Sequence, residues 1–160
     1  MNECAIIANK MVILCYRKYL FEMPITIFLF IWQFPQNLAG LILLIILTFL
    51  KGITHREYYH HKYIFFGPKC PAGLSLGIFV FVQCSTTKAI IIHELGHCKQ
   101  SEILGPLYLL LVGIPSLTMN LLSQHNERVR SRYYQRFPEN WADRLGEKIL
   151  VNSIHPTVLM

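Results

Sequence analysis

The stretch KAIIIHELGHCKQSE, residues 88–102, holds two histidines four positions apart, with a glutamate directly after the first. It follows STT, which offers good N-cap residues, and no helix-stopping signal comes before Gly105-Pro106, so we predict one helix here. On a helix of about 3.6 residues per turn, His93 and His97 share one face, where both imidazoles can reach a single tetrahedral zinc ion. The sequence therefore predicts a metal-binding helix.

Glu94 is predicted to lie about 100° round the helix from His93, beside the metal without binding it. There it can accept a proton from a water molecule whose pKa zinc lowers to about 7, and can pass that proton to a leaving amine. The alternative is a helix whose histidines only pack or contact lipid headgroups. A His-Glu-His cluster straight after AIII would be costly near a membrane without a function.

A histidine pair needs at least one further protein ligand. Downstream of the motif the acidic residues are Glu102, Glu127, Glu139, Asp143 and Glu147. Glu102 should point away from the ligand face, and Glu127 lies in an arginine-rich stretch where a salt bridge is expected. Glu139 and Asp143 share one face of the helix predicted for PENWADRLG, so one carboxylate can bind metal while the other orients a ligand histidine.

Three other side chains near these motifs receive different interpretations. Cys98 lies about 100° round the helix from His97 and is expected to be a small packing residue. His125, the other conceivable ligand, falls in SQHNER, which is typical of a polar turn. Trp141 is expected to pack its helix against a membrane interface.

The composition indicates a membrane protein. Of 160 residues, 53% are hydrophobic and 15% charged, and the mean hydropathy is +0.39, which is too high for an ordinary soluble domain of this length. Residues 24–50 are apolar apart from two glutamines, one asparagine and two threonines, which is long enough for one crossing. Pro35 either kinks this span or begins the transmembrane helix after an interfacial stretch.

Charge and cysteine usage indicate which partners and which cellular location suit the protein. Basic residues outnumber acidic ones 15 to 9 and are scattered among apolar runs and tyrosines, which suits anionic lipid headgroups and argues against nucleic acid. Residues 51–63, KGITHREYYHHKY, are typical of the headgroup region, so their three histidines are expected to be interfacial. Five cysteines without a CxxC pair are expected to stay reduced. We predict an integral protein of the cytoplasmic (inner) membrane, and Lys10, Arg17 and Lys18 favour a cytoplasmic N-terminus.

The remaining segments predict an α+β fold that is mainly α. KYIFF and GLSLGIFVFVQC flank the turn signal GPKCPA and predict a β-hairpin packed beside the metal-binding helix. The apolar run at 105–123 contains Gly113 and Pro115, where we predict a helical hairpin. A straight span there would leave the two motifs on opposite sides of a bilayer, about 30 Å apart. Pro138 is placed to open a C-terminal helix that carries the further ligand.

HELGH followed about forty residues later by ENWADRLG resembles the gluzincin membrane metallopeptidases of the CAAX prenyl protease and HtpX type, and more distantly the β-lactam-sensing receptor proteases. The resemblance implies that His93, His97 and Glu139 bind zinc. It also implies that Glu94 is the catalytic base and that Asp143 supports the site. The strand in GLSLGIFVFV resembles the edge strand with which such proteases hold an extended substrate by β-augmentation.

On this resemblance we expect an integral membrane zinc metallopeptidase that hydrolyses a peptide bond of a peptide or membrane-protein substrate near the bilayer surface. Residues 1–50 would form the N-terminal segment and membrane anchor. Residues 51–160 would form a minimal peptidase domain with the apolar hairpin at 105–123 embedded in it. The alternative is a non-catalytic or degenerate peptidase-like membrane protein with a structural zinc site. The presence of Glu94 argues against that alternative, because a structural site needs no base, whereas the small size of the chain favours it.

Overall fold

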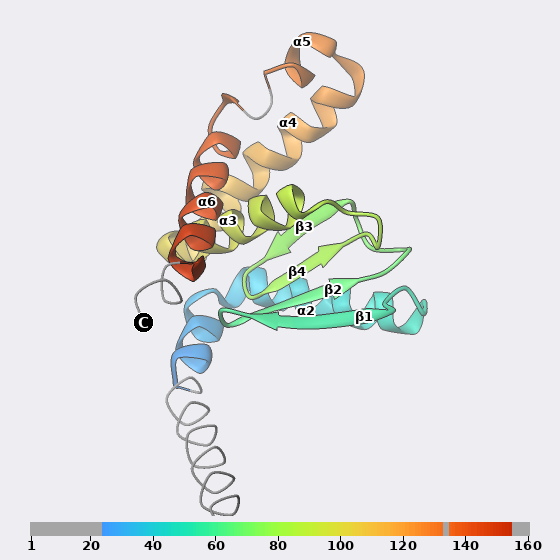
Figure 1. Cartoon of the computed structure of the whole chain (residues 1–160), viewed down its shortest axis with the longest axis vertical. Helices are drawn as coiled ribbons and strands as arrows, with labels where there is room; N and C mark the ends of the chain where they lie inside the picture. The colour runs from blue at the N-terminus through green and yellow to red at the C-terminus, as the bar shows by residue number, and fades with distance from the viewer. Residues whose placement is uncertain (1–23, 133–134, 155–160) are drawn as a thin grey trace, which may run out of the picture.

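The computed structural model describes residues 24–132 and 135–154, and Figure 1 shows their arrangement. The predicted cytoplasmic N-terminus rests on Lys10, Arg17 and Lys18, which lie outside the described residues. The predicted α+β class, mainly helical, is confirmed. In chain order the elements are helix Pro24–Trp32, α2 Phe34–Phe49, β1 His55–Tyr59, β2 Lys62–Phe66, β3 Gly73–Leu76, β4 Phe79–Val82, α3 Lys88–Leu104, the 3-10 helix η1 Gly105–Leu107, the π-helix η2 Leu109–Gly113, α4 Ile114–His125, α5 Glu127–Arg130 and α6 Glu139–Ile154.

The sheet has the order β1-β2-β4-β3 and is built from two hairpins. Strands β1 and β2 pair antiparallel, β3 and β4 pair antiparallel, and the hairpins join through the parallel pair β2 and β4. The predicted hairpin between KYIFF and GLSLGIFVFVQC is therefore wrong. Gly77 takes a φ of 66°, which lets GLSLGIFVFV fold back on itself. KYIFF pairs instead with β1, a strand that the headgroup interpretation of residues 51–63 overlooked.

The central strand β4 explains why helices cover both faces of the sheet. Its four residues are all buried, and successive side chains point to opposite faces. Phe79 and Phe81 pack in one cluster with Leu47 of α2, whereas Val80 and Val82 pack in another with Leu95 of α3. The sheet thus lies between α2 on one side and α3 on the other, and α6 packs on α3.

The apolar segment at 24–50 is bent. Among the described residues, no single helix is both long and apolar enough to cross a bilayer. Helix Pro24–Trp32 and α2 meet that test only as a pair, by length and composition, and the angle between them is 97°. The break in residues 24–50 that was predicted at Pro35 is present, with α2 beginning there, and the one crossing predicted for this segment stays a prediction. Pro35 stands in the first turn of α2, where its missing N–H breaks no helical hydrogen bond.

The bend is stabilised by hydrogen bonds of polar side chains in the middle of the apolar run. Gln36 Nε2 donates to Ser101 Oγ at 2.9 Å and to the Gly105 carbonyl oxygen at 2.8 Å, at the end of α3. Ser101 Oγ in turn donates to Gln33 Oε1 at 2.7 Å. Since these side chains are buried, their hydrogen bonds join the apolar segment to α3 and place α2 against the sheet.

Asn37 joins the same segment to the sheet. Its amide donates to the Phe30 carbonyl oxygen at 3.0 Å, and its Oδ1 accepts the backbone N–H of Ile78 at 2.8 Å. We expect Asn37→Leu to lower the free energy of unfolding by about 1–3 kcal/mol, because two buried backbone groups lose their partner. Thermal unfolding in detergent measures this. The control Thr48→Val changes an exposed residue of α2 and should stay within about 0.5 kcal/mol of wild type. Equal losses in both variants would contradict the assigned role.

The helical hairpin predicted within 105–123 is also wrong. The backbone at Gly113 and Ile114 is right-handed helical, so η2 runs on into α4 without reversing. Pro115 stands in the first turn of α4, a position that proline tolerates. The chain instead turns back after His125, through α5, and α6 returns towards α3 (Figure 1).

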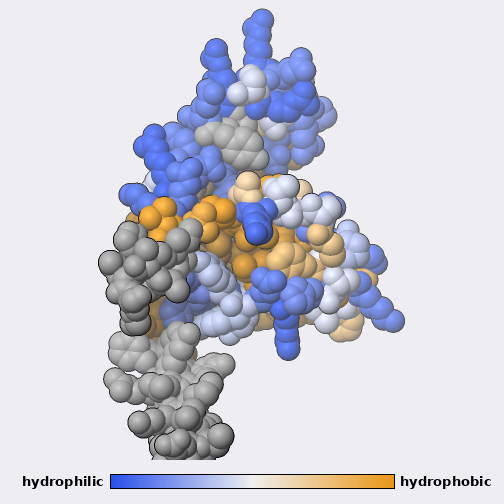
Figure 2. All heavy atoms as spheres, viewed as in Figure 1, coloured by the Kyte–Doolittle hydropathy of each residue, from blue (hydrophilic) through white to orange (hydrophobic). Residues whose placement is uncertain are grey.

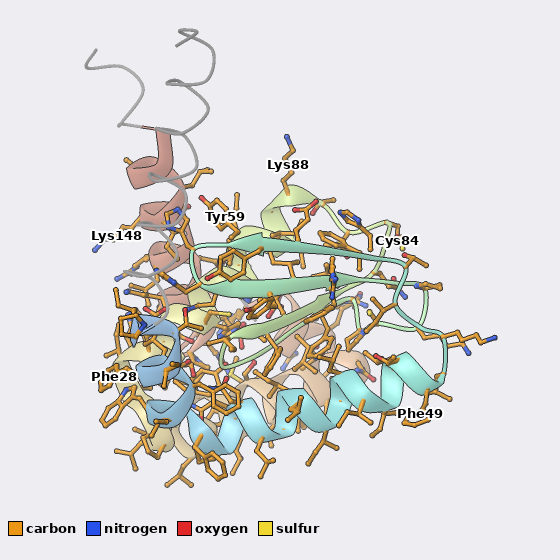
Figure 3. The ribbon with its side chains drawn as sticks, turned by 90° about the horizontal axis from the view of Figure 1, so that it is seen from below. Phe28, Phe49, Tyr59, Cys84, Lys88 and Lys148 are labelled. Atoms are coloured by element: carbon orange, nitrogen blue, oxygen red, sulfur yellow. The ribbon has the colours of Figure 1, made fainter. Side chains whose placement is uncertain are left out.

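The surface reflects this arrangement. Figure 2 shows hydrophilic residues over the α5 end of the molecule and hydrophobic residues gathered near the middle of the same face, around the sheet. Figure 3, seen from below, shows a row of side chains on the outer side of α2 that point away from the sheet, with Phe49 at the far end. Phe49 is 85% exposed and Ile42 is 51% exposed. The outer face of α2 is therefore apolar and bare.

Candidate metal centre

Helices α3 and α6 approach each other more closely than side chains would allow. A Cβ atom on Gly96 would overlap the carbonyl oxygen of Ala142, and a Cβ atom on Gly146 would overlap that of Ile92. These contacts explain the glycine within HELGH and the glycine within ADRLG. The close approach brings Glu139, the first residue of α6, against the histidine face of α3.

His93, His97 and Glu139, the three ligands that the resemblance implies, lie together in the structure. Each offers one ligand atom, these atoms all lie within 4.8 Å of one another, and the group could hold a metal ion. His93 Nε2 lies 3.0 Å and His97 Nε2 lies 3.2 Å from the same oxygen, Glu139 Oε2. The Glu139 side chain is fully buried. Both imidazoles and the carboxylate therefore point at one small volume.

The tautomer of His97 follows from its neighbour Gln100. The Gln100 amide nitrogen donates to the Pro138 carbonyl oxygen at 2.9 Å, and a carbonyl can only accept. That contact turns Gln100 Oε1 towards His97 Nδ1, at 2.7 Å. An amide oxygen also only accepts, so Nδ1 must carry the hydrogen and Nε2 of the neutral ring carries the lone pair.

His93 is oriented in the same way by Asp143. Asp143 Oδ1 lies 2.6 Å from His93 Nδ1, so the carboxylate accepts the Nδ1 hydrogen and leaves the Nε2 lone pair facing Glu139. Metal-binding histidines usually donate their other ring N–H to a carboxylate or carbonyl in this manner. The structure thus provides both candidate histidine ligands with such a partner.

If both rings are neutral, three hydrogen-bond acceptors converge on one point: His93 Nε2, His97 Nε2 and Glu139 Oε2. Glu139 Oε1 is buried and has no hydrogen-bond partner within residues 24–132 and 135–154. Burial lowers the pKa of His93, but hydrogen bonds to Glu139 and Asp143 outweigh it and raise that pKa to about 9. Burial would raise the pKa of Glu139, but hydrogen bonds to both histidines hold it well below its usual range. A proton on His93 Nε2 turns its contact with Glu139 Oε2 into a hydrogen bond but leaves the lone pair of His97 Nε2 facing the same oxygen. A cation bound to all three groups would remove the repulsion at both contacts.

Glu94 lies beside this group and under strand β3. A Cβ atom on Gly73 would overlap Glu94 Oε1, so the glycine lets the edge strand approach the carboxylate. Burial raises the pKa of Glu94, and the neighbouring His97 and His93 and a hydrogen bond to Ser75 oppose that rise. A raised pKa makes this carboxylate a stronger proton acceptor, which is what a general base requires.

Two cavities meet at the metal group. One, of about 440 Å³, lies between β3 and the η2–α4 segment, and its apolar lining consists of Leu74, Leu76, Leu109, Ile114 and Leu117. The other, of about 430 Å³, is lined partly by Ala72 and Asp143. Gly73, His93, Glu94 and Asn120 line both. An extended chain lying along β3 can therefore cross the metal group with one cavity on each side.

Three residues around the metal group were not identified as site residues from the sequence. Gln100 follows His97 by three positions and could have been identified as a same-face partner, because residues three apart on a helix are neighbours. Ser75 and Asn120 come from β3 and α4, and only the folded chain brings them to α3.

The other acidic candidates lie away from the group. Glu102 pairs with the buried Lys62 and with Lys99, the latter at 2.6 Å. Glu127 forms the expected salt bridge, with Arg130 at 3.0 Å.

The remaining side chains also lie outside the metal group. Cys98 is fully buried in the cluster around Val80, as expected for a packing residue. His125 is the exposed last residue of α4, and Trp141 stacks on Phe137 with ring centroids 6.1 Å apart. Among the described cysteines, Cys70, Cys84 and Cys98 are free thiols.

No protein-family model, curated protein or solved structure matches the chain. The site is therefore defined by its own geometry: two buried imidazoles, one buried carboxylate and a second carboxylate beside them, open to two cavities.

Proposed function

We propose that this chain is a zinc metallopeptidase of the cytoplasmic (inner) membrane that hydrolyses a peptide bond close to the bilayer surface. One observation carries the proposal. The Nε2 atoms of His93 and His97 and the carboxylate of Glu139 converge on one point, and the buried Glu94 lies beside them at the junction of two cavities. Two imidazoles and one carboxylate with an open fourth position are the ligands of a catalytic zinc site, whereas structural sites are closed by four protein ligands.

The side chains around this point have separable roles. Zinc would supply a Lewis acid that polarises a carbonyl and lowers the pKa of a water molecule to about 7. Glu94 takes a proton at its carboxylate and passes it to the leaving amine. Asp143 and Gln100 hold the two imidazoles in the tautomer that keeps both Nε2 lone pairs directed inwards.

Strand β3 supports a peptide as the substrate. Among the described strands it is an edge strand that pairs with β4, so its outer edge can pair with an extended chain. That edge lines the apolar cavity next to Glu94. We infer that the substrate lies along β3 and places a large apolar side chain in this cavity, as a segment of a membrane protein would.

The apolar outer surface supports a location at the bilayer. Helix Pro24–Trp32 and α2 form an exposed apolar surface, and α4 adds further exposed apolar side chains, with Leu121 at 52% and Leu122 at 59% exposed. Contiguous exposed apolar side chains of this kind mark membrane or protein contacts. The lipid bilayer is therefore proposed as a partner of the chain.

The test is Glu94→Gln in detergent-purified protein. Zinc content is measured by elemental analysis, and cleavage of a mixture of membrane proteins and peptides is followed by mass spectrometry. Wild type should carry about one zinc and produce cleavage products. Glu94→Gln should keep its zinc and lose about 10²- to 10⁴-fold in rate, the usual worth of a general base.

Glu147→Gln is the matched control, because it makes the same change at an exposed position of α6. It should retain both zinc and activity. Zinc without cleavage in wild type and both variants would favour the non-catalytic alternative. Loss of zinc in Glu94→Gln as complete as in His93→Ala would contradict the role given to Glu94.

A further inference from the structure

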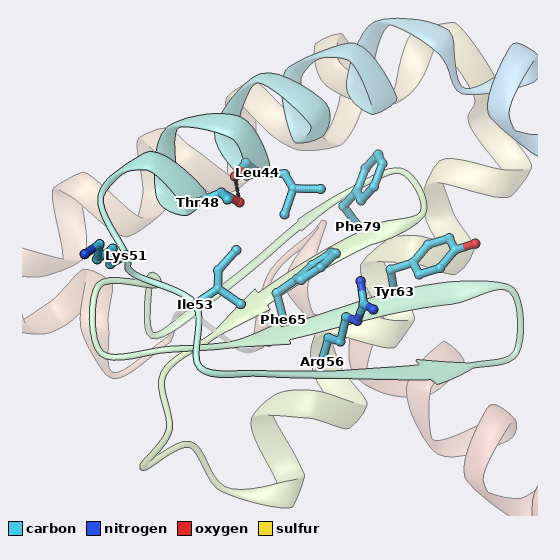
Figure 4. Close-up of a pocket in the computed structure, with 8 residues that line it drawn as sticks. All are labelled: Leu44, Thr48, Lys51, Ile53, Arg56, Tyr63, Phe65 and Phe79. Carbon is cyan, nitrogen blue, oxygen red and sulfur yellow. Dashed lines mark hydrogen bonds between the residues drawn. The ribbon is translucent and has the colours of Figure 1, made fainter.

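A cavity of about 590 Å³ lies on the face of the sheet opposite the metal centre, between the sheet and α2 (Figure 4). It exists because α2 packs over β3 and β4, while the neighbouring strands β1 and β2 extend past the helix. Leu44 and Thr48 of α2 form one wall, and residues of β1, β2 and β4 form the floor. None of these residues belongs to the metal group.

The floor of this groove is aromatic and apolar. The Phe65 and Phe79 rings lie 6.3 Å apart at 30°, and the Tyr63 and Phe79 rings lie 6.3 Å apart at 28°. Thr48 Oγ1 donates to the Leu44 carbonyl oxygen within its own helix at 2.7 Å, so its hydroxyl needs no partner from the groove. A narrow apolar surface of this kind suits a hydrocarbon chain.

Two cations line the same groove. Figure 4 shows Arg56 reaching up from β1 beside Tyr63 and Phe65, and Lys51 at the other end, just after α2. Both residues are exposed, and neither side chain forms an ion pair or hydrogen bond with another described residue. The groove therefore presents positive charge beside an apolar floor, which is complementary to an amphiphile with an anionic head.

The position of α2 indicates where such an amphiphile comes from. One side of α2 forms the wall of the groove, and the other side is the bare apolar face that includes Ile42, Ile45 and Phe49. A face of this kind is expected to lie among lipid tails. Lys51 follows directly at the end of the helix, where basic side chains meet headgroups.

We propose that the groove between α2 and the β1–β2 hairpin binds one anionic phospholipid, with an acyl chain over Phe65 and Phe79 and its phosphate paired with Arg56. A guanidinium can hold two phosphate oxygens at once, and Lys51, at the other end of the groove, adds general attraction for an anionic lipid. The site is separate from the metal centre and does not depend on peptide hydrolysis. It specifies one bound lipid in addition to the general contact of the apolar surface with a bilayer.

The test uses the full chain in vesicles that contain phosphatidylglycerol with a photoactivatable group in its acyl chain. Crosslinked peptides are located by mass spectrometry. We expect crosslinks on the peptides that carry Leu44, Phe65 and Phe79. The double variant Lys51→Gln/Arg56→Gln should reduce their yield roughly tenfold, as the loss of a charge-assisted contact predicts.

The matched control is Lys88→Gln/Arg128→Gln, which removes the same charge at exposed positions outside the groove and should leave the yield unchanged. Leu44→Trp fills the groove without changing charge and should also abolish the crosslinks. Equal yields with photoactivatable phosphatidylcholine would overturn the proposal, and so would crosslinks confined to the outer face of α2.

Discussion

Glu139→Ala is expected to remove most of the bound metal. Glu139 is the fully buried carboxylate on which both imidazoles converge, and without it only two neutral ligands remain. Asp143→Asn should behave differently, because Asp143 orients His93 through Nδ1 and lies outside the metal group. Loss of such a partner typically weakens metal affinity by roughly 10- to 100-fold, so this variant should still fill at high zinc concentration.

Metal content after dialysis against a graded series of chelator concentrations separates these cases. Gln100→Leu should weaken metal affinity about as much as Asp143→Asn does. Gln100 accepts a hydrogen bond from Nδ1 of His97, just as Asp143 accepts one from Nδ1 of His93. Melting curves without metal show that each variant has folded. A Glu139→Ala protein with full zinc content, combined with zinc loss in Asp143→Ala or His125→Ala, would mean that the third ligand is misassigned.

Gly96→Ala should destabilise the fold and disable the metal group at once. The added methyl group would overlap the Ala142 carbonyl oxygen, which belongs to the backbone of α6 and cannot rotate away. The helices must separate instead, at a cost of about 3 kcal/mol, the upper part of the range for overpacking. Since Glu139 begins α6, the same movement withdraws it from His93 and His97, and a metal site that loosens by about 1 Å fails.

Gly113→Ala is the matched control for this prediction. Gly113 is also helical, but the nearest atom to a Cβ there belongs to the Leu109 side chain, at 3.4 Å, which is an ordinary van der Waals distance. Alanine is the better helix former by up to about 1 kcal/mol, so this variant should be as stable as wild type or more stable. Unfolding in detergent and zinc content are measured for both. Equal stability of the two variants would show that α3 and α6 do not touch at Gly96.

Much of the local structure could be predicted from the chain itself. The helix of the HELGH motif begins after Thr87, whose side chain makes no capping hydrogen bond, and ends before Gly105, which takes a φ of 54°. Its end could be predicted because stopping signals act over a few residues. The start of α6 after Pro138 could be predicted in the same way. Helical spacing also placed His93 with His97, and Glu139 with Asp143, on common faces.

The tertiary structure decided what depends on residues far apart in the sequence. Strand pairing is one case. The side-chain patterns of β2 and β4 are compatible with parallel and with antiparallel pairing. The parallel pair forms in a sheet that is packed against α2 on one face and α3 on the other. The bend at Gln33 is another. Its hydrogen bonds reach Ser101, 68 residues away, and a run that reads as one apolar span cannot reveal such a partner. The histidine tautomer is the third case, since Gln100 is turned by a carbonyl of residue 138 that reaches α3 only when two glycines let α6 approach.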